Sequence, residues 1–150
     1  MVGIGYDSHR FEAGRPLILG GVEIEHDRGL VGHSDADVLT HAVIDAILGA
    51  AGGGDIGTLF PDSEPEWKDA DSIDLLRTAV GTVSGPIVNV DATVICEQPR
   101  LGPYRAEMER VLGEATSARV SVKATTNEGM GWIGRGEGIA CIAVASVQSE

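Results

Sequence analysis

Asp7, His9 and His41 have the residue types of a metal site. Asp7 and His9 stand two apart in an apolar N-terminal run, so a strand would turn both side chains to one face. His41 lies on the polar face of an expected helix and would supply a third ligand, although separate surface histidines remain the alternative. A carboxylate and two imidazoles suit zinc, and three protein ligands leave a fourth position for water or substrate. Asp37 and Asp45, four residues to either side of His41, are candidates to hold its second ring nitrogen.

A second kind of chemistry is expected where this helix begins. Ser34, with Asp37 three residues later, resembles a capping box, so we expect Ser34 to cap the helix. His33 is not needed for capping and is the better candidate to bind an anion beside the helix N-terminus. In the loop that follows the helix, Asp55 and Asp62 would bind hydroxyl groups or a cation, or belong to an ordinary acidic surface loop.

The second half of the chain concentrates groups that suit a phosphate. The segment 123–128 ends an expected strand in two threonines, an amide and a carboxylate, and glycines recur over 131–138. Small residues let backbone N–H groups approach a phosphate. Thr126 would donate to a phosphoryl oxygen, Glu128 would hold a divalent ion, and Lys123 is a candidate to bind an anion. Turn chemistry for the glycines and an ion pair between Arg135 and Glu137 are the structural alternatives.

Composition restricts the class of protein. The chain has 150 residues, of which 43% are hydrophobic, enough for a single domain over 1–150. The formal net charge of −12 argues against a nucleic-acid protein and against docking on an anionic membrane. Residues 1–75 carry 4 basic and 15 acidic side chains, whereas residues 76–150 carry 7 and 8. We therefore expect cations to bind in the first half and an anion in the second.

The hydrophobic pattern predicts an α+β domain, with a mixed sheet covered by helices on one face. Strands are expected over 2–11, 87–96, 120–125 and 139–147, a hairpin over 16–24, a loop over 55–68, and helices over 34–51, 71–83 and 104–112. The glycines at 52–54 should end the first helix. Cys96 and Cys141 are expected to be reduced, buried thiols. With no signal peptide or membrane span in view, a cytoplasmic location is the default.

Five motifs, in order, resemble the 2-C-methyl-D-erythritol 2,4-cyclodiphosphate synthases of the non-mevalonate route to isoprene units. They are D-S-H at 7–9, H-S-D-A-D-V-x-x-H at 33–41, G-D-I-G-x-L-F-P-D at 54–62, K-A-T-T-N-E at 123–128 and G-R-G-E-G-I-A at 134–140. The resemblance spans nearly the whole chain and is weaker over about 76–120. Arg100 stands where many members have lysine, and Asn127 and Trp132 replace a frequent threonine and phenylalanine.

The resemblance implies a metal-dependent lyase that forms a homotrimer with active sites between subunits. It implies a zinc-like ion on Asp7, His9 and His41, and a second ion, magnesium or manganese, held by Glu128 and the substrate diphosphate. The family converts 4-diphosphocytidyl-2-C-methyl-D-erythritol 2-phosphate into the 2,4-cyclodiphosphate and CMP. The resemblance leaves open whether an isoprenoid diphosphate occupies the central channel of the trimer.

The same resemblance assigns roles to residues. His33 and Thr126 would stabilise the transition state. The erythritol part would be bound by Asp55, Ile56, Gly57, Phe60, Pro61, Asp62, Ser63 and Glu64. The cytidine diphosphate part would be bound from the other subunit by Cys96, Glu97, Gln98, Pro99, Arg100, Leu101, Gly102, Thr125 and Thr126. Further substrate contacts are expected from Asp7, Ser8, His9, His33, Ser34, Asn127, Glu128, Trp132 and Arg135.

Two other functions fit the same residues. One is a zinc-dependent phosphohydrolase that activates water at the open metal position. The other is a trimeric binding module for a metal ion or an isoprenoid phosphate, without catalysis. A cyclic product would separate the synthase from both.

Overall fold

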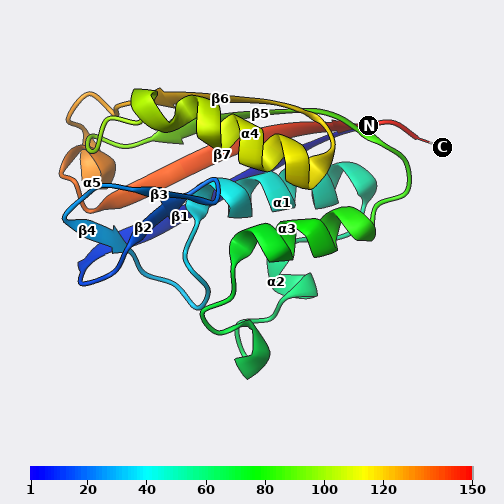
Figure 1. Cartoon of the computed structure of the whole chain (residues 1–150), viewed down its shortest axis with the longest axis horizontal. Coiled ribbons are helices and arrows are strands. Elements are labelled where there is room, and N and C mark those ends of the chain that lie inside the picture. The colour runs from blue at the N-terminus through cyan, green and yellow to red at the C-terminus, as the bar shows by residue number, and fades with distance from the viewer. Residues whose placement is uncertain (150) are drawn as a thin grey trace.

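A five-stranded mixed sheet organises residues 1–149, the part of the chain that the computed structural model describes (Figure 1). The strand order is β4 (Arg28–Leu30), β1 (Val2–Ala13), β7 (Gly138–Val147), β5 (Ile87–Ile95) and β6 (Arg119–Thr125). β5 and β6 are parallel, and the other neighbouring pairs are antiparallel. The expected hairpin forms a separate two-stranded sheet from β2 (Leu17–Leu19) and β3 (Val22–Ile24). The predicted α+β class and mixed sheet are confirmed.

Three helices cover one face of the large sheet. α1 (Val38–Ala51) packs across β1 and β7, and α4 (Arg105–Thr116) packs beside β6. α3 (Ser72–Gly81) lies against both α1 and α4 (Figure 1). Shorter segments connect them: the helices α2 (Ile56–Leu59) and α5 (Gly131–Gly134) and the 3₁₀ turns η1 (Pro65–Trp67) and η2 (Gly102–Tyr104).

α1 lies directly on the backbone of β1 because β1 has glycines where the two meet. A Cβ atom at Gly3 would overlap the carbonyl oxygen of Ala46, and one at Gly5 would overlap that of Ala42. Any side chain at these positions would push the helix outward. The close contact brings His41, which immediately precedes Ala42 in α1, over Asp7 on β1.

The opposite face of the sheet is apolar and exposed. Side chains alternate along β1, so Gly3 and Gly5 are buried under α1 while Ile4, between them, is 71% exposed. Large apolar side chains on this face come from three strands: Val2, Ile4, Tyr6, Val88, Ile142 and Val144. An apolar surface of this kind usually marks an interaction site.

The first helix begins later than predicted. Ser34 does not cap it: Ala36 has φ +58°, a left-handed conformation that breaks the helical path, and the helix starts at Val38. The cap is Asp37, whose Oδ1 accepts the N–H of Thr40 at 3.0 Å. The same carboxylate accepts the N–H groups of Gly20 at 2.9 Å and Gly21 at 2.8 Å, which ties the β2–β3 hairpin to α1.

Most of the remaining elements follow the predictions, and the differences are in short segments and helix ends. β4 and α5 were not predicted, because each is too short to show a hydrophobic period. The predicted loop over 55–68 contains α2 and η1, and the helix expected at 104–112 extends to Thr116. Gly52 ends α1 in the left-handed conformation, as expected. Cys96 and Cys141 are free and buried, also as expected.

Within the described residues, no helix has both the length and the apolar character needed to cross a membrane.

The glycine contact is open to a direct test. We expect Gly5→Ala to destabilise the fold by about 1–3 kcal/mol, because the methyl group must displace the backbone of α1. It should also weaken divalent-metal binding, since the displacement carries His41 away from β1. Gly81→Ala, at the exposed end of α3 with open space around it, is the matched control. Urea unfolding and zinc titration of both variants measure the two effects. Equal stability of the two variants would contradict the assigned role of Gly5.

Candidate metal and substrate site

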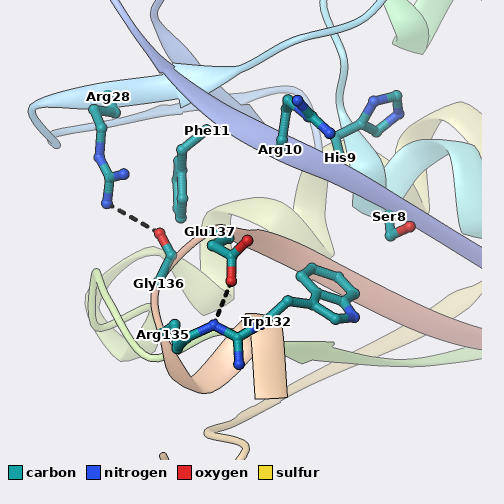
Figure 2. A pocket seen from close by; sticks show the side chains of 9 residues that line it. All are labelled: Ser8, His9, Arg10, Phe11, Arg28, Trp132, Arg135, Gly136 and Glu137. Carbon is teal, nitrogen blue, oxygen red and sulfur yellow. Dashed lines mark hydrogen bonds and ion pairs between the residues drawn. The ribbon is translucent and has the colours of Figure 1, made fainter. Parts of the chain in front are cut away.

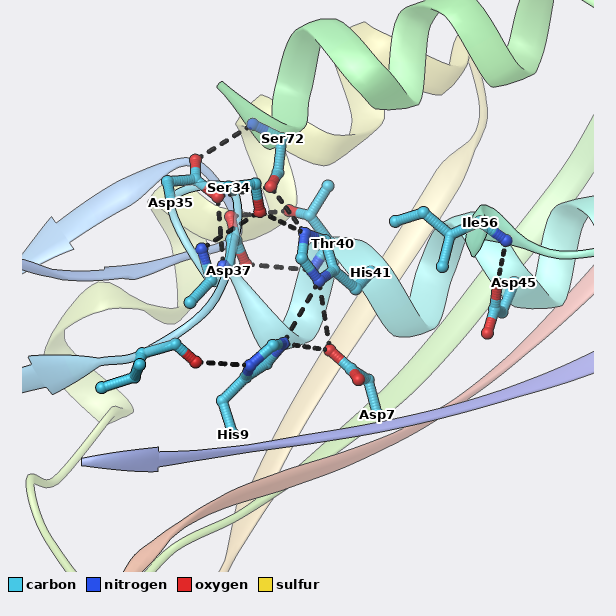
Figure 3. A network of polar contacts seen from close by, with 12 residues as sticks. Asp7, His9, Ser34, Asp35, Asp37, Thr40, His41, Asp45, Ile56 and Ser72 are labelled. Carbon is cyan, nitrogen blue, oxygen red and sulfur yellow. Dashed lines mark hydrogen bonds and ion pairs between the residues drawn. The ribbon is translucent and has the colours of Figure 1, made fainter. Parts of the chain in front are cut away.

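Asp7, His9 and His41 meet at the N-terminal end of α1 (Figure 3). The Asp7 Oδ2 atom is 2.8 Å from His9 Nε2 and 3.2 Å from His41 Nδ1. The two ring nitrogens are 3.4 Å apart, and one ligand atom from each residue lies within 4.8 Å of the others. The strand supplies two ligands from one face and the helix supplies the third, as the sequence predicted.

The second ring nitrogen of His9 is committed to the backbone. His9 Nδ1 lies 2.8 Å from the carbonyl oxygen of Val31. A carbonyl oxygen only accepts hydrogen bonds, so Nδ1 carries the proton and donates it. This bond fixes the ring plane and leaves Nε2 aimed at Asp7 and His41. Hydrogen bonds of this kind orient the histidines of metal sites in general.

His41 is held by two serines and not by the predicted aspartates, and the Oγ atom of the first, Ser34, lies 3.1 Å from His41 Nε2. Its Nε2 atom lies 2.8 Å from Ser72 Oγ, whose hydroxyl in turn makes a very short hydrogen bond to Asp35 (Figure 3). The single hydroxyl proton of Ser72 points to that carboxylate, so Ser72 Oγ must accept the proton of His41 Nε2. Nδ1, which faces Asp7 and His9, is therefore the ligating atom of His41.

The predicted partners of His41 have other functions. Asp37 is fully buried and is occupied by α1 and the hairpin. Asp45 Oδ1 accepts the N–H of Ile56 at 2.8 Å and so ties α1 to the following loop. Both predictions were wrong for the same reason. Spacing along α1 identified residues of its polar side, but the partners of His41 are Ser34, which precedes α1, and Ser72, which begins α3.

The electrostatics of the triad fit a cation. Burial raises the pKa of Asp7, but hydrogen bonds and charges from His41 and His9 outweigh it and lower the pKa to about 2. Burial lowers the pKa of His9, yet the hydrogen bond and charge of Asp7 raise it above its ordinary value. Ring nitrogens of two imidazoles thus face one carboxylate, and a divalent cation would be held among them. The donor set of one carboxylate and two oriented imidazoles fits such an ion.

A cavity of about 360 Å³ opens beside the triad. It brings together many of the predicted residues from three separate motifs: Asp7, His9, His33, Ser34, His41, Ile56, Gly57, Phe60, Pro61 and Asp62. His33 Nε2 lies 3.1 Å from the carbonyl oxygen of Glu64. Asp55 does not line the cavity but caps α2, accepting the N–H of Thr58 at 2.7 Å. Trp67 and Leu75 complete the wall and were not predicted.

A second cavity, of about 460 Å³, lies between β5 and β6 at their C-terminal ends. It is lined by Cys96, Glu97, Pro99, Arg100, Leu101, Gly102, Pro103, Ala124, Thr125 and Thr126. Except for Pro103 and Ala124, these are residues predicted to bind the cytidine diphosphate part. Within one chain this cavity shares no lining residue with the cavity beside the triad.

A third cavity, of about 640 Å³, adjoins the triad on the other side of His9. Figure 2 shows Arg10, Arg28 and Arg135 around it, together with Phe11 and Trp132. Ser8, Trp132 and Arg135 were predicted to contact the substrate, and they lie here and not beside His33. Arg135 Nε pairs with Glu137 Oε2 at 2.6 Å, which agrees with the structural alternative for these two residues.

Two predicted charged residues lie outside the triad. Lys123 pairs with Asp91 on the neighbouring strand, so its charge is already compensated. Glu128 lies in the exposed turn between β6 and α5 with φ +54°, and it is not part of the Asp7–His9–His41 cluster among the described residues.

The fold and the triad define an α+β enzyme with a site for a divalent metal, and comparison with known proteins gives the family. The model of the YgbB family matches residues 1–148. The 2-C-methyl-D-erythritol 2,4-cyclodiphosphate synthase of Symbiobacterium thermophilum is 55% identical, covering 98% of each chain. A solved synthase structure, described as a CDP-bound form, has a TM-score of 0.88 at 34% identity and covers 99% of this chain and 100% of that one. The bifunctional IspDF of Campylobacter jejuni has a TM-score of 0.91 at 42% identity, covering 96% of this chain and 41% of that chain.

The chain therefore belongs to the YgbB family of 2-C-methyl-D-erythritol 2,4-cyclodiphosphate synthases. Members with this name are phosphorus–oxygen lyases of isoprenoid biosynthesis, and this protein is such an enzyme. The resemblance found in the sequence motifs is confirmed.

Ser72, whose hydroxyl lies nearer to His41 than that of Ser34, gives a prediction. We expect Ser72→Ala to weaken zinc binding about 10–100-fold, the usual cost of losing a partner that orients a metal ligand. Thr78→Ala, on the exposed side of the same helix, is the control and should bind zinc like the parent protein. Competition titration with a chromophoric chelator measures the affinity, and thermal unfolding of the metal-free proteins checks the fold. Parental affinity in a folded Ser72→Ala protein would contradict the assignment.

Proposed function

We propose that the enzyme converts 4-diphosphocytidyl-2-C-methyl-D-erythritol 2-phosphate into 2-C-methyl-D-erythritol 2,4-cyclodiphosphate and CMP. The observation that carries this proposal is the meeting of Asp7, His9 and His41 beside the loop 55–62, in a chain of this family. A three-ligand metal site next to a cavity with a few polar groups suits chemistry on a small phosphorylated substrate.

Asp7, His9 and His41 would hold a zinc-like ion, and Glu128 would hold a second ion, magnesium or manganese, together with the substrate diphosphate. When bound, such cations withdraw charge from phosphoryl oxygens and keep anionic groups close together. The chain's own contribution is to fix the ligands. His9 is held by Val31, and His41 is held by Ser34 and Ser72, so neither imidazole needs to reorient when an ion binds.

The reaction needs positioning more than proton transfer. An oxygen of the 2-phosphate forms a bond to the β-phosphorus, and the bond from that phosphorus to the bridging oxygen breaks, releasing CMP. The attacking phosphate is already ionised, so no strong general base is required. Ring closure is intramolecular, so a folded substrate contributes much of the rate.

Each cavity would bind one part of the substrate. Asp55, Ile56, Gly57 and residues 60–64 would bind the erythritol and its phosphate. Residues 96–102, with Thr125 and Thr126, would bind the cytidine diphosphate part. His33 beside the first cavity and Thr126 beside the second would donate hydrogen bonds to the charge that develops in the transition state.

The complete site would form between subunits of a homotrimer. In one chain the triad cavity and the 96–102 cavity share no lining residue, whereas the substrate must span both. The exposed apolar face carries Ile4, Tyr6 and Val144 and supports association through this face of the sheet.

Two further assignments follow from the same features. Ser8 and Arg10 continue the exposed side of β1, so the arginine-lined cavity adjoins the apolar face. This supports an isoprenoid diphosphate as a ligand of the central channel. The two buried free thiols, Cys96 and Cys141, support a reducing compartment, for which we propose the cytoplasm.

Turnover of the cytidyl substrate tests the proposed function. We expect the cyclic diphosphate and CMP in equal amounts, with no oxygen from the solvent in either, and loss of turnover after chelation. Mass spectrometry of the products in ¹⁸O water measures this. Solvent oxygen in the product would indicate a phosphohydrolase, and zinc binding without turnover would indicate a binding module.

Two histidine variants sharpen this experiment. His33→Ala should lower kcat about 100-fold or more, as expected for the loss of a donor to the transition state, while zinc affinity stays near that of the parent. His41→Ala should lose zinc, because it removes a ligand. Loss of zinc from His33→Ala as complete as from His41→Ala would contradict the assigned role of His33.

The trimer has its own test. We expect light scattering to give the mass of three chains, and Ile4→Asp to give smaller species with little activity, because a charge enters the apolar face. Ala106→Asp, on the exposed side of α4, adds the same charge elsewhere and is the control. A monomer with full activity would overturn the shared site.

A further inference from the structure

The turn that carries Thr126 and Glu128 has an unusual backbone. Glu128 has φ +54° and Gly129 has φ +73°, so two consecutive residues lie in the left-handed region. Only glycine adopts this conformation without cost, and a glutamate there needs support from its surroundings. The turn directs the N–H groups of Asn127 and Gly129 to one side, where they can bind an anion.

The anion that these N–H groups bind is a side chain of the protein. Glu97 Oε1 accepts the N–H of Asn127 at 3.3 Å and that of Gly129 at 2.9 Å. The N–H of Glu128, between them, is directed to Thr126 Oγ1 at 3.2 Å. Every amide from 127 to 129 therefore has a partner, and two of the three depend on one oxygen atom of Glu97.

Glu97 also belongs to the segment that lines the 96–102 cavity. Its neighbour Cys96 donates its backbone N–H to the carbonyl oxygen of Thr125 at 3.0 Å. The 96–102 segment and the turn after β6 are thus joined at two successive points, first through the backbone and then through Glu97. A shift of one segment would be transmitted to the other.

We propose that Glu97 is a positioning residue. It holds the turn 126–129 so that Thr126 and Glu128 stand in fixed places beside the 96–102 cavity. The inference rests on the proposed function, which gives Thr126 and Glu128 their roles, and adds the residue through which the nucleotide segment sets their positions. Besides its place in the 96–102 segment, Glu97 acts on Thr126 and Glu128 through this turn, and it neither ligates the metal nor donates to the reacting phosphates.

One feature of the geometry makes the role separable from charge. A single oxygen, Oε1, accepts both hydrogen bonds. The side-chain amide of glutamine has an oxygen at the same place and can accept both, although bonds to a neutral acceptor are weaker. Glu97→Gln should therefore keep the turn in place, whereas Glu97→Ala removes the acceptor altogether.

Amide hydrogen exchange of the metal-free protein reports the turn directly. Exchange at Asn127 and Gly129 should be at least tenfold faster in Glu97→Ala than in the parent, and Glu97→Gln should restore most of the protection. Glu97 is only partly buried, so both variants are expected to fold, and thermal unfolding verifies this. Unchanged exchange in Glu97→Ala would overturn the proposal.

Function is then measured on the same proteins. With CDP present, Glu97→Ala should bind Mn²⁺ about 10–100-fold more weakly and lose kcat by a similar factor, with a smaller change in KM. Glu97→Gln should recover most of both losses. Equal defects in the two variants would assign the effect to the charge and overturn the positioning role. If exchange is faster in Glu97→Ala but the parent protein shows no turnover, the positioning role is supported and the proposed function is overturned.

Discussion

The contact between α1 and β1 determines where the metal ligands meet. Gly3 and Gly5 leave no side chain between the helix and the strand, so backbone packs on backbone. His41 immediately precedes Ala42, which makes this contact, and Asp7 and His9 lie just beyond it on β1. The three ligands span 34 positions of the chain, from Asp7 to His41, and thus reach one point without a long loop to position them. Tight backbone packing transmits small displacements, and here it sets the accuracy of the site.

Much of the fold was predictable from hydrophobic periodicity. The long strands, the hairpin and the three main helices follow apolar periods that a short window already reveals. The start of α1 was not predictable in this way. Ser34 and Asp37 are both good caps, and the choice depends on the left-handed conformation of Ala36 and on the two hairpin N–H groups that Asp37 accepts. These are tertiary contacts, and local spacing does not contain them.

The site likewise has features that the local sequence predicts and features that depend on tertiary contacts. The metal ligands were predictable because strand and helix periods place Asp7, His9 and His41 on defined faces. The partners of His41 were not, because the path of the chain before α1 directs Ser34 to it, and Ser72 belongs to α3, whose approach to α1 depends on packing. Residue spacing alone gave no sign that the predicted substrate contacts fall into separate cavities of one chain, whereas the family resemblance already assigned residues 96–102 to another subunit. The charge pattern was informative only for the triad, since Lys123 in the balanced half is already paired with Asp91.

The alternation of side chains along β1 has a consequence for how the gene can vary. Odd-numbered positions carry the contact glycines and the ligands Asp7 and His9, and even-numbered positions carry the apolar face and Arg10. A single substitution therefore affects only one of the two faces of the strand. Insertion or deletion of one codon between Gly3 and His9 would exchange the two faces over part of the strand, turning ligands outward or placing a side chain under α1. The length of this strand segment is therefore more strictly constrained than the identity of its exposed residues.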